Sequence, residues 1–75
     1  DEYETAIAHF EKYLKDFPHS IYADDAAWHI VEARRLMGQR GAYIEAMRDF
    51  IEDFPESRHV RAARARLGIS DEEDS

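Results

Sequence analysis

A stretch near the start of the chain occurs a second time about forty residues later, in residues 3–20 and 43–57. Both copies begin with Tyr, continue through a small residue and a Phe, and end in a Phe-Pro-x-Ser sequence. Ala6 and Ala46 are 40 residues apart, whereas Pro18 and Pro55 are 37 apart, so the second copy is three residues shorter. A period of this size, in which one helical pattern ends at a Pro and another begins, is typical of an α-helical solenoid. The repeat therefore predicts an all-α fold of stacked helical hairpins.

Apolar residues recur at helical spacing, roughly 100° per residue, along most of the chain. The predicted antiparallel helices cover residues 2–17, 21–37, 42–54 and 58–67. Pro18 and Pro55 end the first and third helices, because proline has no amide donor and disfavours helical geometry in the residue before it. Ser20 and Ser57 are predicted to cap the second and fourth helices. The pattern thus gives about two helical hairpins joined by short connections.

The 75 residues are enough for one small domain. We expect the domain to span residues 1–69, and residues 70–75 to form a disordered acidic tail, since four consecutive acids follow Ser70. An apolar content of 44% favours a packed core over disorder. Small side chains let helices approach closely, so Ala6, Ala26 and Ala46 are predicted to be buried at helix crossings.

Composition excludes several classes of function. The formal net charge of −7 disfavours nucleic acid as a partner, and the absence of Cys excludes disulfides and thiolate sites. No apolar run approaches the roughly 20 residues that a membrane span requires, so direct membrane insertion is not predicted. No signal peptide is seen, and the chain begins at Asp1. We therefore interpret it as a mature form or a fragment of a longer protein.

One motif resembles a known family. Residues 6–18, Ala-x3-Phe-x2-Tyr-x4-Pro, resemble the second helix of a tetratricopeptide repeat (TPR). By this resemblance, residues 21–38 and 42–54 form one full repeat. Residues 58–68, which end in Leu-Gly as the family does, form the first helix of the next repeat. The resemblance implies a TPR-like solenoid segment that acts as a non-catalytic scaffold for protein–protein interaction.

Two short segments resemble one branch of this family. Residues 17–23 and 54–57 carry its aromatic-Pro-x-Ser signature, which in the first copy leads into an Ala-rich helix. The branch includes bacterial envelope proteins, among them the Tol–Pal-associated cell-division coordinator and the lipoprotein of the outer-membrane β-barrel assembly machine. The resemblance implies a segment of a larger protein in the periplasm or at the inner face of the outer membrane, with the cytoplasm as the other location.

The chain departs from the family pattern at three places. Val31 stands where the family usually has Gly, and Arg34 where it usually has an aromatic residue. The predicted loop at residues 39–41 is three residues longer than usual, and the third helix is three residues shorter. These departures are expected to loosen or re-angle the second helix against the third and to change the shape of any groove.

Trp28 lies off the apolar arc predicted for the second helix. It shares one helical face with charged residues at spacings of three, four and seven. In tetratricopeptide proteins this face lines the concave groove that binds partners, and Trp and Arg are frequent anchors of interfaces. The predicted partner-binding residues are Asp25, Trp28, Glu32, Arg35, Arg61 and Arg64. The alternative is that Trp28 packs against a neighbouring helix.

The same region differs from chaperone-binding repeats, which bind the carboxylate end of a peptide through Lys and Asn. Asp25, Trp28 and Glu32 stand in the region where that clamp needs those residues. An acidic C-terminal peptide is therefore not the predicted ligand.

The fourth predicted helix is basic. Its arginines are Arg58, Arg61, Arg64 and Arg66, and residues 58–67 contain none of the 17 acidic residues of the chain. Arginine at the positive end of a helix is disfavoured, so we expect compensating carboxylates, such as those of Glu52, Asp53 and Glu56. The arginines form either a patch for an acidic partner or a solvated, locally paired face.

No enzymatic, metal or cofactor site is predicted. The serines show no nucleophile–base pattern, and no Gly-rich phosphate loop is present. His29 has Asp25 four residues before it and Glu32 three after, but three ligands without a fourth are a weak metal signal.

A structural role is the alternative to a scaffold. The first helix carries an apolar stripe along residues 3–17 and lacks the helix that would precede it in a repeat. Such a stripe is usually covered by another chain, which predicts self-association into a homo-oligomer or the capping of a longer array.

Overall fold

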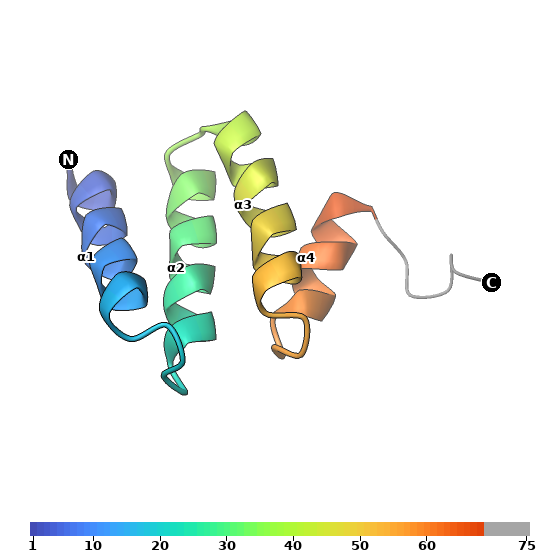
Figure 1. The fold of residues 1–75 in the computed structure, drawn as a ribbon. Coiled ribbons are helices and arrows are strands. Elements are labelled where there is room, and N and C mark those ends of the chain that lie inside the picture. The colour runs from blue at the N-terminus through green and yellow to red at the C-terminus, as the bar shows by residue number, and fades with distance from the viewer. Residues whose placement is uncertain (69–75) are drawn as a thin grey trace.

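The computed structural model of the chain describes residues 1–68. It contains the helices α1 (Glu2–Asp16), α2 (Ala23–Leu36), α3 (Arg40–Asp53) and α4 (Val60–Leu67), arranged in a row (Figure 1). Each helix packs against the next, and no strand occurs in the described part of the chain. The predicted all-α fold of helical hairpins is confirmed. The predicted acidic tail at residues 70–75 lies outside the described residues.

The second and fourth helices begin later than predicted. Ser20 and Ser57 were predicted as their N-caps, but each serine lies in a turn that precedes the helix. The Ser20 hydroxyl accepts a hydrogen bond from the Tyr22 amide at 3.1 Å, and the Ser57 hydroxyl accepts one from the His59 amide at 3.1 Å. Each serine thus closes a short turn onto the amide two residues ahead. The helices start only after these turns, at Ala23 and Val60.

The connection between α2 and α3 is shorter than the sequence indicated. Gly38 has φ of +76°, the left-handed conformation that glycine adopts readily and that closes the turn. Gln39 is the N-cap of α3, and Arg40 and Gly41 are already helical. The predicted long loop at residues 39–41 is therefore wrong. Gly68, with φ of +80°, ends α4 after Leu67, the last residue of the predicted fourth helix.

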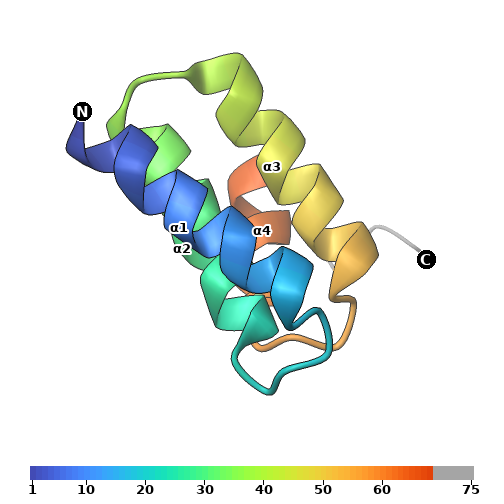
Figure 2. The same ribbon diagram turned by 60° about the vertical axis from the view of Figure 1, so that its left-hand side comes forward.

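The helices form two layers. Figure 2 shows α1 and α3 on the near side of the molecule and α4 behind them, next to α3. Side chains of α4 and of the turn before it also reach α2, as described below. As a result, α2 has α1 and α3 on one side and the side chains of α4 on the other.

The main core lies where α2, α3 and α4 meet. Its buried residues are Trp28, Val31, Met47, Phe50 and Ala63. Ala26 is buried, as predicted, whereas Ala6 and Ala46 are only half-buried. Burial of all three alanines was therefore a wrong prediction, and Ala46 instead lines a groove between α1 and α3.

The first helix is the least covered. Ile7 is its one buried residue, whereas Tyr3 and Phe17 of the same predicted apolar stripe are 41% and 57% exposed. Phe10 is half-buried, with its ring stacked on His29 at a centroid distance of 5.1 Å. Within residues 1–68, no helix has both the length and the apolar character needed to cross a membrane.

Candidate partner-binding face

Trp28 belongs to the core. Its side chain is 8% exposed, and its ring is stacked on that of His59 at 5.2 Å with an interplanar angle of 5°. The Phe50 ring lies 5.2 Å away on α3, and the Arg66 guanidinium lies 5.1 Å from the Trp28 ring centroid. Of the two roles considered for Trp28, the structure shows packing against neighbouring segments, because α4 and the turn before it cover that side of α2.

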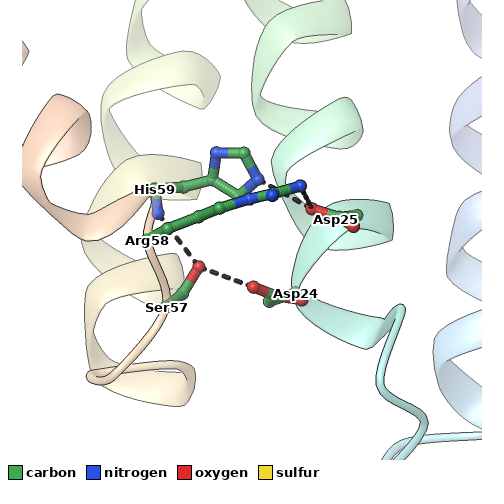
Figure 3. Close-up of polar contacts among 5 residues, drawn as sticks. All are labelled: Asp24, Asp25, Ser57, Arg58 and His59. Carbon is green, nitrogen blue, oxygen red and sulfur yellow. Dashed lines mark hydrogen bonds and ion pairs between the residues drawn. The ribbon is translucent and has the colours of Figure 1, made fainter.

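Asp25 is held by the turn before α4 (Figure 3). One oxygen of its carboxylate accepts hydrogen bonds from Arg58 at 3.1 Å and from the His59 ring at 2.8 Å. The neighbouring Asp24 accepts a hydrogen bond of 2.7 Å from the Ser57 hydroxyl. The first turn of α2 is thereby joined to the turn that precedes α4, although 33 and 34 residues separate the partners in sequence.

Glu32 joins the other end of α4 to α2. Its carboxylate accepts hydrogen bonds from Arg66 at 3.0 Å and from Arg35, one turn further along α2, at 2.8 Å. The charges that offset these arginines therefore come from α2. The expectation that Glu52, Asp53 and Glu56 compensate the arginines at the start of the fourth helix is wrong for Arg58, which pairs with Asp25.

The structure divides the six predicted residues into three groups. Asp25, Glu32 and Arg35 lie with Arg58 and Arg66 on one charged surface, which we call the α2/α4 face. Trp28 lies beneath this surface in the core. Arg61 and Arg64, which also have interaction partners, stand on the side of α4 turned away from Arg66, because helical residues three apart share a face and residues two or five apart do not.

Several residues of this surface were not predicted as a site. Arg58 and Arg66 were identified as basic residues, but nothing in the sequence paired them with α2. Ser57 was predicted only as a helix cap, and His59 carried no signal in the sequence. Because the α2/α4 face brings together segments more than thirty residues apart, only the packing of α4 reveals it.

The carboxylates of this face have perturbed pKa values. The hydrogen bond from His59, aided by Arg58, lowers the pKa of Asp25 below its ordinary value of 3.8. Partial burial raises the pKa of Glu32, but the hydrogen bonds from Arg66 and Arg35 outweigh this and lower it below 4.5. The hydrogen bond that Arg66 donates to Glu32 raises the pKa of Arg66. Both carboxylates are therefore ionised in the folded protein at neutral pH.

Acid should weaken the link between α2 and α4. A carboxyl group whose pKa is lower in the folded chain stabilises the fold above its unfolded pKa, and loses this effect as the pH falls through its folded pKa. We expect Glu32→Gln to lower the stability at pH 7 by about 1 kcal/mol. The melting temperatures of the variant and the wild type should converge as the pH falls below 4.5, the ordinary pKa of a Glu carboxyl group. Thermal unfolding followed by circular dichroism at several pH values tests this prediction. A difference in melting temperature that does not narrow would contradict the pairing of Glu32 with the arginines.

One group of potential metal ligands is present among residues 1–68. Ligand atoms of Asp24, Asp25 and His59 lie within 4.8 Å of one another. The His29 combination considered from the sequence is not this group, because the His29 ring stacks on Phe10. In the group that does form, Ser57 and the cationic Arg58 already bond the two carboxylates. The arrangement is that of a structural hydrogen-bond cluster.

The fold and the comparisons identify the family. Antiparallel helices that pack in sequence, with equivalent residues in α1 and α3, define an α-helical repeat protein. The profile of the tetratricopeptide repeat family matches residues 1–20 and 25–57, more than half of the chain. The chain therefore belongs to the tetratricopeptide repeat family. No curated protein and no solved structure matches it. Repeats of this family generally mediate protein–protein interactions and are typically non-catalytic.

Proposed function

We propose that the chain is a scaffold module of a larger bacterial envelope protein and that it binds a protein partner through the α2/α4 face. A hollow of about 360 Å³ beside this face carries the proposal. Its rim has the guanidinium groups of Arg35, Arg40 and Arg66, and its apolar lining comes from Tyr43, Ile44 and Met47. An aromatic or aliphatic side chain flanked by carboxylates fits this combination of apolar floor and cationic rim.

The ion pairs between α2 and α4 support this role, because they hold the two helices in a fixed relation before a partner arrives. Asp25 bonds Arg58 just before α4, and Glu32 bonds Arg66 near the end of α4. Both arginines are therefore pre-positioned. A preformed surface binds with a smaller loss of conformational entropy than a mobile one. In this proposal Trp28 supports the face from beneath, while Arg61 and Arg64 extend the basic surface around α4.

The envelope location is the second part of the proposal. It is based on the resemblance of residues 17–23 and 54–57 to the envelope branch of the family. Fractionation of the native protein into the cytoplasm would contradict this part and leave the binding face untouched.

Site-specific crosslinking tests the binding face. A photoreactive residue in place of Arg35 should give a discrete crosslinked partner in a bacterial envelope extract. Lys12 is the matched control, because both residues are exposed cations paired with a carboxylate of their own helix. We expect crosslinking from position 35 to exceed that from position 12 by about tenfold, as for a specific interface centred on the hollow. Equal products at both positions, or none at either, would contradict the proposal.

A second copy of the chain is the alternative partner. Tyr3, Phe17, Ile21 and Tyr22 leave apolar surface exposed around α1 and the turn after it. In that case the crosslinked product would be the chain itself, and the position-12 control on α1 would give it as well. Sedimentation of the purified chain would then show a dimer at the concentrations used.

A further inference from the structure

A second surface lies over a different face of α2, between α1 and α3. A groove of about 1110 Å³ runs over α2 between α1 and α3. Ala27, Ile30 and Val31 of α2 contribute its floor, and Leu14 of α1 and Ala46 of α3 contribute apolar parts of the walls. Figure 2 shows α1 and α3 standing apart on this side of the molecule. Small side chains at Ala27 and Ala46 leave the space open.

The groove is acidic. Its lining includes six carboxylate side chains, those of Glu11, Asp24, Glu45, Asp49, Asp53 and Glu56. Arg34 and His19 are the basic residues that line it, and Arg34 is directed to Gln39 by a hydrogen bond of 3.0 Å. Asp24 bonds Ser57, whereas the other five carboxylates make no ion pair within residues 1–68. Negative charge therefore predominates in the lining of the groove.

We propose that this groove binds a basic amphipathic helix of a partner protein. The apolar floor matches the apolar face of such a helix, and the carboxylates match Lys and Arg on its flanks. The helix α2, which forms the floor, has 14 residues. At 1.5 Å per residue the floor is about 21 Å long, which accommodates about four turns of a bound helix.

A second copy of the chain does not supply this helix. The chain's own basic helix is α4, but its apolar residues Val60, Ala63 and Leu67 pack into the core of the same molecule. A copy of α4 therefore has no apolar face to offer. The groove is also distinct from the α2/α4 face, because none of Asp25, Glu32, Arg35, Arg58 and Arg66 lines it.

A designed peptide tests the proposal. The probe is a labelled peptide of about 14 residues with Leu at helical spacing and Lys elsewhere, and the control peptide has Glu in place of each Lys. Fluorescence anisotropy should show binding of the Lys peptide alone. Its affinity should fall at least about tenfold between 50 mM and 300 mM sodium chloride, because exposed charges are screened by salt. No binding, or equal binding of both peptides, would overturn the proposal.

Matched double variants separate the groove from the net charge of the chain. The double variant Glu45→Gln/Asp49→Asn removes two charges from the groove, and Glu2→Gln/Glu52→Gln removes two exposed charges outside it. All four side chains are exposed, so folding should be retained and is checked by circular dichroism. We expect the groove variant to bind about tenfold more weakly and the control within about twofold of wild type.

Two outcomes would count against the groove. Equal weakening by both double variants would mean that the peptide responds to net charge and not to a site. A dimer of the chain that dissociates only in the groove variant would mean that a second copy occupies the groove. In either case a basic partner helix would be excluded as the occupant.

Discussion

Replacing Trp28 with Ala is expected to destabilise the domain by about 3–5 kcal/mol, the usual cost of truncating a buried aromatic side chain. The Trp28 ring contacts Phe50 on α3, stacks on His59 and lies under the Arg66 guanidinium. The substitution therefore removes contacts with two other segments at once. A domain of 75 residues has a total stability of roughly 4–11 kcal/mol, so much of the protein should unfold on mild heating.

Urea denaturation followed by circular dichroism measures this loss. Tyr22→Ala is the control, because Tyr22 is a large aromatic residue at the N-terminus of the same helix and is 62% exposed. The control substitution should cost less than about 0.5 kcal/mol. Similar stabilities for the two variants would contradict the buried position of Trp28. The result also affects binding studies, since lost binding by Trp28→Ala would report unfolding and not a missing contact.

The helices could be predicted because their signals are local. Apolar spacing and the prolines at positions 18 and 55 locate α1 and α3 to within one or two residues at most ends. The errors at the starts of α2 and α4 come from the serines. A Ser after Phe-Pro-x reads as an N-cap, yet its hydroxyl bonds the amide two residues ahead and delays the helix.

The position of Trp28 could not be predicted from the same signals. A helical wheel assigns a face by its own composition, and Trp28 stands between Asp25 and Glu32. In the structure, those two carboxylates bond α4 and the turn before it, and His59 covers the ring between them. A face rich in charge was therefore an interface between helices, because Asp25 and Glu32 each bond a residue of another segment.

The acidic groove was hidden for a related reason. Glu45 and Asp49 fall outside the apolar positions of the third helix, and each side chain is exposed in the structure. They form one acidic groove only because α1, which carries Glu11, lies across the groove from α3. A charge cluster built from separate helices depends on their spacing, and the sequence pattern does not specify that spacing.

Replacing Phe50 with Ala should also cost about 3–5 kcal/mol, whereas the same change at Phe10 should cost about 1–2 kcal/mol. The two residues occupy equivalent positions of the repeat, 40 residues apart. Phe50 is 2% exposed and contacts Trp28, Phe54 and His59 at ring distances of 5.2, 5.4 and 6.1 Å. Phe10 is half-buried and has one described aromatic contact, with His29.

The difference between the two losses of stability should arise from the number of segments that pack around each helix. Phe50 of α3 is enclosed by α2 and by the segment that leads into α4. Phe10 lies on α1, which packs against α2 alone among residues 1–68. Urea denaturation of both variants measures the two losses, and equal slopes would show that both transitions expose the same surface. Equal losses would mean that the two copies of the repeat are enclosed alike. A larger loss at Phe10 would place the main core between α1 and α2, contrary to the cluster around Phe50.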